Sequence, residues 1–186
     1  MSRWLRILVT LIRARFRGTV HPQQETSLGF RVWPTDVDLT VMNHAAMLAI
    51  MEMGRLDLMC RTGFLRHARK NRWHVPMASI SVRFVKSLKR FQKFEVKTKI
   101  LYWDEKWVYI RHGIVREDKI VAIALAKATV KKGREPVAFD RIIREFGWEV
   151  KPSPRPEMID WLEKAEMLLF KDPTAHLKDS SWFTRV

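Results

Sequence analysis

The segment from Ala45 to Met59 most constrains how this chain can fold. It is apolar almost all round, interrupted mainly by Glu52, Arg55 and Asp57, and Gly63 follows it as a stop signal. A helix with apolar residues on every side is buried and does not lie on a surface. We therefore expect the rest of the fold to surround this helix.

Strand-like runs lie on both sides of this helix in the sequence. Before it, residues 27–33 are typical of a strand, which Pro34 ends. After it come four runs bounded by turn or charge signals: Ala78 to Val85, Lys93 to Trp103, Trp107 to Val115 and Ile120 to Lys131. From residue 94 to 100, side chains suited to a buried face alternate with charged side chains. This alternation indicates an antiparallel sheet that is covered on one face only. This order predicts an α+β hotdog fold, an antiparallel sheet wrapped around a long central helix.

The first eighteen residues predict an amphipathic basic helix. One side carries polar and basic residues at helical spacing: Arg3, Arg6, Thr10, Arg13 and Arg17. The other side carries large apolar residues: Trp4, Leu5, Leu8, Leu11, Ile12 and Phe16. The apolar run is interrupted well short of the roughly 20 residues that a bilayer span needs. We expect the helix to lie on an anionic membrane surface, with its arginines near headgroups and its apolar side inserted. The alternative is a helix docked on the protein's own core or on a partner subunit.

Two more helices are expected after the sheet, over residues 140–146 and 157–170. The chain is then divided into a basic helix (1–18), a hotdog domain (19–136) and a C-terminal helical extension (137–186). Cys60 is the only cysteine, so neither an intramolecular disulfide nor a cysteine-based zinc site is possible. A reducing cytoplasmic location, peripheral to the inner face of a membrane, fits this composition.

The net charge of +15 predicts an anionic partner: nucleic acid, anionic lipid or a polyphosphate such as coenzyme A. The basic residues are scattered through strand-like segments, and zinc-finger, P-loop and RNA-binding signatures are absent from the sequence. This distribution argues against nucleic acid. The sequence also lacks an H-E-x-x-H motif and clustered metal ligands, so we expect no metal.

Two stretches carry a resemblance to a known family. The first runs from Arg31 to Leu39 (Arg-Val-Trp-Pro-Thr-Asp-Val-Asp-Leu) and continues in Met42-Asn43-His44 and Glu52-Met53-Gly54-Arg55. The second comprises residues 84–96 and Tyr102-Trp103-Asp104-Glu105-Lys106-Trp107. In order and spacing they resemble 4-hydroxybenzoyl-CoA thioesterase-like proteins, most closely the membrane-associated relatives, over roughly residues 28–136. The resemblance implies hydrolysis of a fatty or aromatic acyl-CoA by a homodimer or homotetramer with sites at subunit interfaces. Coenzyme A then enters as part of the substrate, and no separate cofactor is expected.

The resemblance assigns the leading catalytic role to Asp38. In the family the second Asp of an Asp-x-Asp pair acts as nucleophile or as base for water, and Asp38 matches it. Relatives usually place a His four residues later, before Met-Asn-Asn, whereas here a shorter linker leads directly into Met42-Asn43-His44. Backbone N–H groups at the helix start, near Asn43, His44 and Ala45, are expected to hold the oxyanion. His44 is also a candidate to replace the missing His, and the alternative for Asp38 is a turn or capping residue.

Other charged residues have two interpretations each. Glu52 either pairs with Arg55, three residues on, or faces the acyl pocket as a second carboxylate. Asp36 is expected to form the turn before Asp38. Basic residues after the last strand match the place where relatives meet coenzyme A phosphates, although they also suit edge protection: Lys131, Lys132 and Arg134.

The alternative function is a non-catalytic acyl-CoA or lipid-binding protein at the membrane surface. Every candidate site residue follows residue 18. Removal of residues 1–18 is therefore expected to leave hydrolysis of a soluble acyl-CoA intact.

Overall fold

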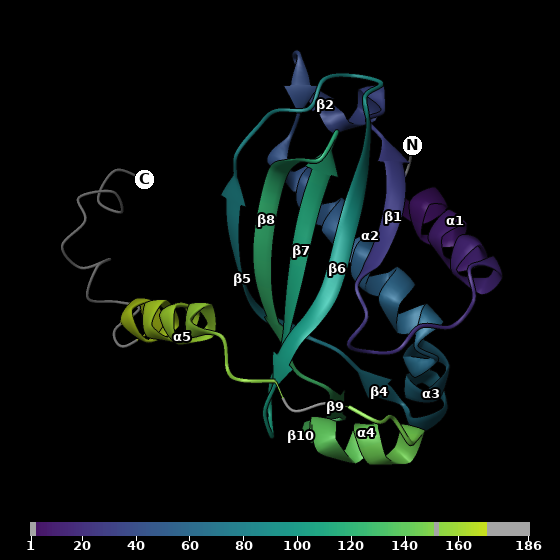
Figure 1. The fold of residues 1–186 in the computed structure, drawn as a ribbon, viewed down its shortest axis with the longest axis vertical. Coiled ribbons are helices and arrows are strands. Elements are labelled where there is room, and N and C mark those ends of the chain that lie inside the picture. The colour runs from purple at the N-terminus through teal and green to yellow at the C-terminus, as the bar shows by residue number, and fades with distance from the viewer. Residues whose placement is uncertain (1–2, 151–152, 171–186) are drawn as a thin grey trace, which may run out of the picture. The chain divides into compact units, whose positions relative to one another are not determined.

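A five-stranded antiparallel sheet curves around one long helix in the computed structural model, which describes residues 3–150 and 153–170. The strand order is β1-β6-β7-β8-β5, with bounds β1 Thr26–Arg31, β5 Met77–Phe84, β6 Lys93–Trp103, β7 Val108–Arg116 and β8 Lys119–Ala128. Helix α2 (His44–Arg61) crosses one face of this sheet (Figure 1). The α+β hotdog arrangement predicted from the element order is confirmed.

Helix α2 is buried because it packs closely on β1, β6 and β7. Its upper half meets the sheet through Met47, Ile50 and Met51, in one cluster with Ala122 and Ala124 of β8. The small alanines let the helix approach the sheet. A second apolar cluster fills the lower half of the domain, where helices α3 (Phe64–Asn71) and α4 (Phe139–Phe146) cover the sheet.

A polar layer lies between α2 and the sheet. The buried ring of His112 in β7 lies 3.1 Å through Nδ1 from the Thr98 hydroxyl and 3.3 Å through Nε2 from the Arg55 guanidinium. Burial, and then the charge of Arg55, lowers the pKa of His112 to about 3. The ring is therefore neutral at physiological pH, with Nδ1 donating to Thr98 and Nε2 accepting from Arg55.

The turn expected at Asp36 is present, whereas the short strands that follow it and those at the other end of the domain were not predicted. A 3₁₀ turn η1 (Pro34–Asp36) leads into a tight hairpin of β2 (Val37–Asp38) and β3 (Val41–Met42). At the other end of the domain, β4 (Trp73–His74), β9 (Lys131–Lys132) and β10 (Glu135–Pro136) form a small sheet of order β10-β9-β4. Elements of two or three residues leave no periodic signal in a sequence.

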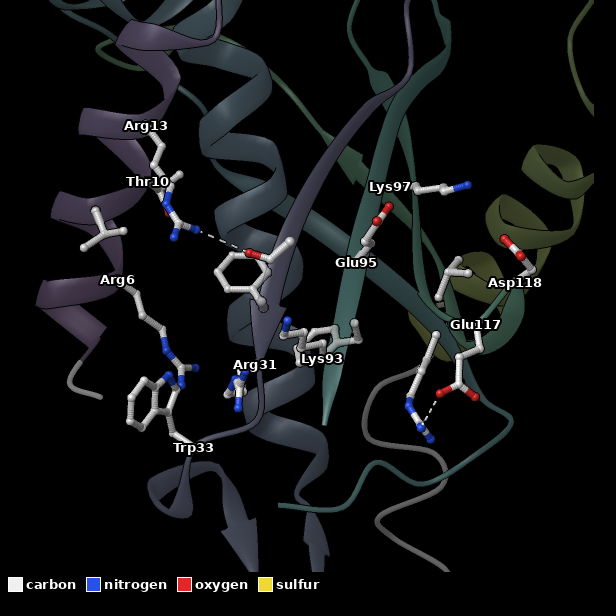
Figure 2. A pocket seen from close by; sticks show the side chains of 16 residues that line it. Arg6, Thr10, Arg13, Arg31, Trp33, Lys93, Glu95, Lys97, Glu117 and Asp118 are labelled. Carbon is white, nitrogen blue, oxygen red and sulfur yellow. Dashed lines mark hydrogen bonds and ion pairs between the residues drawn. The ribbon is translucent and has the colours of Figure 1, made fainter. Parts of the chain in front are cut away.

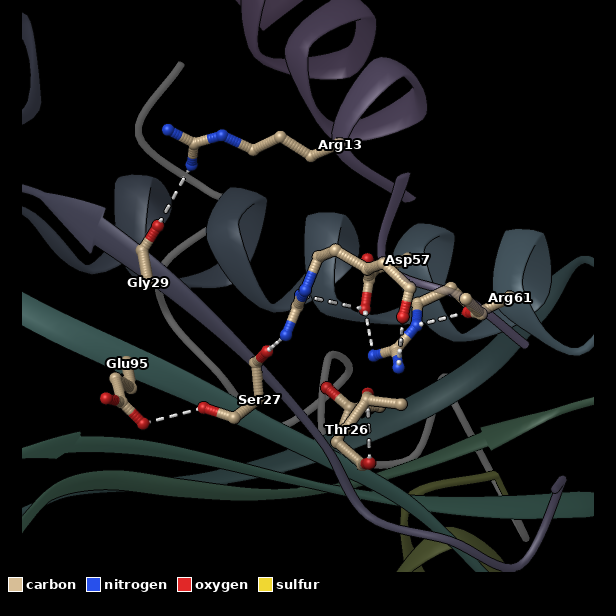
Figure 3. Close-up of polar contacts among 10 residues, drawn as sticks. Arg13, Thr26, Ser27, Gly29, Asp57, Arg61 and Glu95 are labelled. Atoms are coloured by element: carbon tan, nitrogen blue, oxygen red, sulfur yellow. Dashed lines mark hydrogen bonds and ion pairs between the residues drawn. The ribbon is translucent and has the colours of Figure 1, made fainter. Parts of the chain in front are cut away.

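Helix α1 (Arg3–Phe16) docks on α2 through its polar side. Arg6 and Thr10 are buried, and Arg13 donates to the carbonyl of Gly29 (Figure 3). Just after the helix, Arg17 reaches the carbonyl of Ser27 and the carboxylate of Asp57, which Arg61 of α2 also approaches at 3.6 Å.

The apolar side of α1 faces outward: Trp4, Leu5, Leu8, Ile12 and Phe16 are exposed. The expectation that the arginines meet lipid headgroups is therefore wrong for Arg6, whose buried side chain contacts the protein. The helix is docked on the protein, as the alternative interpretation states. It docks through its polar side and not through its apolar side.

The chain divides into two compact units, Met1–Ser153 and Pro154–Val186. The first unit contains α4, so the boundary lies inside the predicted extension 137–186. The second contains α5 (Glu157–Phe170), where Arg155 pairs with Asp160 and Glu163 at 2.7 and 2.5 Å. Residues 171–186 of the predicted extension lie outside the described residues. None of the described helices is long and apolar enough to cross a bilayer.

Candidate functional site

Asp38 lies at the end of β2, with an exposed side chain. It pairs with Val41 across a two-residue loop in which Leu39 takes a left-handed φ of 55°. Such a conformation favours glycine, and Leu39 is held there while 96% exposed. The shorter linker noted in the sequence is therefore this tight hairpin, which projects Asp38 beside the start of α2.

Asn43 connects Asp38 to helix α2. Its side-chain oxygen accepts from the backbone N–H of Ala46 at 2.6 Å and so caps the helix, while its amide nitrogen donates to Asp38 Oδ1 at 3.3 Å. Its own backbone N–H donates to the carbonyl of Asp36 at 2.8 Å. The cap of α2 is thus Asn43, which also holds the carboxylate of Asp38 beside the start of the helix.

A pocket of about 740 Å³ opens beside Asp38. The His44 ring forms one wall and lies 4.2 Å from the ring of Phe84, centroid to centroid. The backbone N–H groups of His44 and Ala45 belong to the first turn of α2, so the helix offers them no carbonyl partner. Side chains from three segments complete the lining: Val41, Met42, Met47, Val85, Lys86 and Ser87. The arrangement combines a carboxylate, a helix N-terminus and an apolar wall.

Glu52 does not belong to this pocket. It lines a separate, largely apolar cavity of about 520 Å³ with Arg55, Met53, Trp73 and other side chains of the lower core. Burial lowers the pKa of Arg55, and the negative charge of Glu52 opposes that shift. Glu52 therefore acts electrostatically on Arg55, as the ion-pair interpretation requires, and its role as a second carboxylate stays a prediction.

A model of the thioesterase-like superfamily matches residues 32–162, which cover the pocket, α2 and the whole strand series after it. The chain belongs to this superfamily. The resemblance drawn from Arg31 to Leu39 and the later motifs is confirmed.

Proteins from other organisms are similar to different lengths of this chain. A protein of Saccharomyces cerevisiae described as a probable thioesterase is 30% identical over 116 residues, which is 60% of this chain and 50% of the yeast protein. Protein THEM6 of Xenopus laevis is 25% identical over 166 residues, 86% of this chain and 78% of that protein. The chain thus spans about half the length of the yeast relative and more of the frog one.

Solved structures of low identity share the fold. The probable thioesterase YbaW of Escherichia coli superposes with a TM-score of 0.60 at 16% identity, covering 64% of this chain and 94% of YbaW. A Staphylococcus aureus protein solved in complex with CoA gives a TM-score of 0.56 at 15% identity, covering 76% of this chain and 96% of that protein.

The three basic residues expected to meet coenzyme A lie at the other end of this thioesterase-like domain. Lys131 and Lys132 form β9 of the small sheet, and Arg134 lies in the turn before β10. None of them lines the pocket beside Asp38, so their role as coenzyme A ligands stays a prediction. The cation that lines the pocket is Lys86, which sequence reasoning missed although it falls inside the motif from 84 to 96.

Cys60 is not a candidate nucleophile. Burial, and then the charge of Asp57, raises the pKa of its thiol to about 11, so the thiol is protonated at neutral pH. Within residues 3–150 and 153–170, no three side chains of His, Cys, Asp or Glu gather as a metal site.

Proposed function

We propose that this protein hydrolyses an acyl-CoA thioester, with Asp38 as nucleophile or as base for the attacking water. The exposed carboxylate of Asp38, held by Asn43 at the N-terminus of α2 and beside the pocket, carries this proposal. Membership of the thioesterase-like superfamily supports it.

The chemistry needs few groups because the carbonyl of a thioester is weakly stabilised by resonance. An oxygen of Asp38, or of a water deprotonated by Asp38, bonds to the carbonyl carbon, and the carbonyl oxygen becomes an oxyanion. The free N–H groups of the first turn of α2, on His44 and Ala45, stabilise that negative charge. Collapse breaks the C–S bond, and sulfur leaves with its electron pair as the coenzyme A thiolate. In the nucleophile version, water then hydrolyses the acyl-Asp38 anhydride to the free acid.

The working unit in this proposal is a homodimer or homotetramer. Strand β5 is at one edge of the sheet, is exposed or half-exposed along its length and carries Phe84 of the pocket wall. An open edge strand of this length favours pairing with another strand. A second copy on β5 would close the pocket from the side and supply the rest of the acyl-CoA site, whose cations include Lys86.

Peripheral attachment to an anionic membrane surface is also part of the proposal. The outward side of α1 carries exposed Trp4, Leu8 and Phe16. Beside it runs a groove of about 1030 Å³ between α1 and the β1–β6 edge, with cations along its strand wall (Figure 2): Arg31, Lys93 and Lys97. Apolar side chains that insert next to cations that meet headgroups are the combination by which interfacial helices bind.

The second candidate is a non-catalytic acyl-CoA or lipid-binding protein, because relatives carry a His that the short β2–β3 hairpin lacks. Hydrolysis of a panel of palmitoyl-CoA and aryl-CoA substrates, followed by thiol release, separates the two. We expect release of free thiol from at least one member of the panel. Saturable acyl-CoA binding without thiol release would favour the second candidate.

A further inference from the structure

A buried ion pair ties the first helix to the turn that precedes Asp38. Nη2 of Arg6 in α1 lies 2.5 Å from both carboxylate oxygens of Asp36 in η1, thirty residues away. The two side chains are only 7% and 5% exposed. Figure 2 shows Arg6 reaching from α1 toward Trp33, at the start of this turn. Two such charges are stable away from water only while each neutralises the other.

Asp36 in turn shapes the candidate site through two further hydrogen bonds. Its Oδ2 accepts the backbone N–H of Trp33 at 2.9 Å, which closes the turn. Its backbone carbonyl accepts the N–H of Asn43 at 2.8 Å. Asn43 then donates to Asp38 at 3.3 Å. A continuous series of polar contacts therefore runs from Arg6 to the carboxylate of Asp38.

We propose that Arg6 is a positioning residue for Asp38, so that α1 completes the active site instead of only flanking it. This inference rests on the proposed function of Asp38. Without Arg6 the Asp36 carboxylate would be buried without its counter-charge, and the turn would have to rearrange to expose it. A shift of about 1 Å in a reacting group is enough to lower a rate substantially. Residues 1–18 are therefore expected to be required for full hydrolysis, in contrast to the expectation drawn from the sequence.

Arg6 is not needed merely to hold α1 in place. Arg17 bonds to the Ser27 carbonyl and approaches Asp57, and Arg13 donates to the Gly29 carbonyl at 3.4 Å. These contacts lie on β1 and α2, away from the η1 turn. Arg13→Gln is therefore a matched control, since it removes an arginine contact of the same helix without touching Asp36.

The test compares steady-state hydrolysis of a soluble acyl-CoA, well below the melting temperature, for Arg6→Met, Arg13→Gln and the double variant Arg6→Gln/Asp36→Asn. We expect Arg6→Met to lower kcat at least ~10-fold with KM changed less than about twofold. Arg13→Gln should keep the wild-type kcat. The double variant should recover most of the lost activity, because an amide at 36 can still accept from Trp33 and no buried charge is left unpaired.

Wild-type kcat in folded Arg6→Met would overturn the positioning role. A loss of kcat in Arg13→Gln equal to that in Arg6→Met would also overturn it. If Arg6→Met does not fold, the double variant decides, and a double variant that is folded but inactive would overturn the positioning role. The proposed function has a separate test. If Asp38→Asn still hydrolyses the substrate, Asp38 takes no part in the reaction, and this conclusion does not depend on the result for Arg6. Loss in Asp38→Asn with full activity in Arg6→Met would refute only the positioning role.

Discussion

Three aspartates of this chain have different roles because their surroundings differ. Asp38 is exposed and meets the pocket. Asp36 is buried and neutralised by Arg6. Asp57 is wholly buried on α2, where burial raises its pKa although the charges of Arg17 and Arg61 oppose the shift. Of the three, only Asp38 can reach a substrate without first breaking an ion pair.

His112 should make the stability of the domain depend on pH. Its folded pKa is about 3, whereas an ordinary histidine titrates near 6.5. Between these values the unfolded chain binds a proton that the folded chain does not, so stability falls as the pH drops from about 6.5 toward 3. The slope from this one group is at most about 1.4 kcal/mol per pH unit.

Urea denaturation of wild type and His112→Gln across this pH range measures the effect. We expect the variant to be less stable at neutral pH and to lose less stability on acidification. His74→Gln, which changes an exposed histidine, is the control. Parallel pH curves for wild type and His112→Gln would show that the ring is not the titrating group.

At the scale of the residue, the sequence could identify candidates but not their partners. Asp36 was expected to form a turn, and its bond to the Trp33 N–H confirms this. The pairing with Arg6 was out of reach, because thirty residues separate the two and nothing local favours it. Asn43 was singled out for its backbone, whereas its side chain makes the contact to Asp38.

At the scale of the element, α2 approaches β6 so closely at Gly54 that no side chain fits between them. A Cβ on Gly54 would come within 2.4 Å of Thr98 Oγ1 and 2.7 Å of Val96 Cγ1. Gly54→Ala should therefore destabilise the domain by about 1–3 kcal/mol, because α2 must move off the sheet. Gly29→Ala is the control, since nothing lies within 4 Å of the Cβ it would add. Equal unfolding free energies for the two variants in denaturant titrations would contradict this packing.

Helix α1 gives a prediction about membranes. We expect the intact protein to float with anionic vesicles, and Leu8→Glu to abolish flotation because it places a charge in the exposed apolar side. Salt should weaken binding only in part, since the charge of Arg6 is paired with buried Asp36 and is not available to lipid headgroups. Trp161→Ala changes an exposed apolar residue outside α1, in α5, and this variant should still float. If the intact protein does not float with anionic vesicles, the proposed attachment to a membrane surface is wrong.

The longer elements were predictable because their periodicity is set by burial. The bounds of β6 and α5 agree with the sequence expectation, and α2 extends the predicted helix by one residue at its start and two at its end. The outward direction of the apolar side of α1 was not predictable. A stripe of apolar residues usually marks the buried side, whereas here the polar side is docked because its arginines bond to buried Asp36 and to carbonyls of β1.

At the scale of the whole molecule, the high positive charge has several separate uses. Some arginines are internal counter-charges, as Arg6 and Arg61 are for Asp36 and Asp57. Others lie along the groove beside α1, and Lys86 lies in the pocket. The net charge of +15 therefore could not locate the site, because charge totals contain no information on which cations are already paired.

If Asp38 carries out thioester hydrolysis, then kcat/KM on the best acyl-CoA substrate must fall in Asp38→Asn. The substitution changes little volume, and Asp118→Asn in the exposed β7–β8 turn is its matched control. We predict a loss of at least ~100-fold for Asp38→Asn, with an unchanged melting temperature, and no loss for Asp118→Asn. A wild-type rate in Asp38→Asn would show that Asp38 takes no part in the hydrolysis.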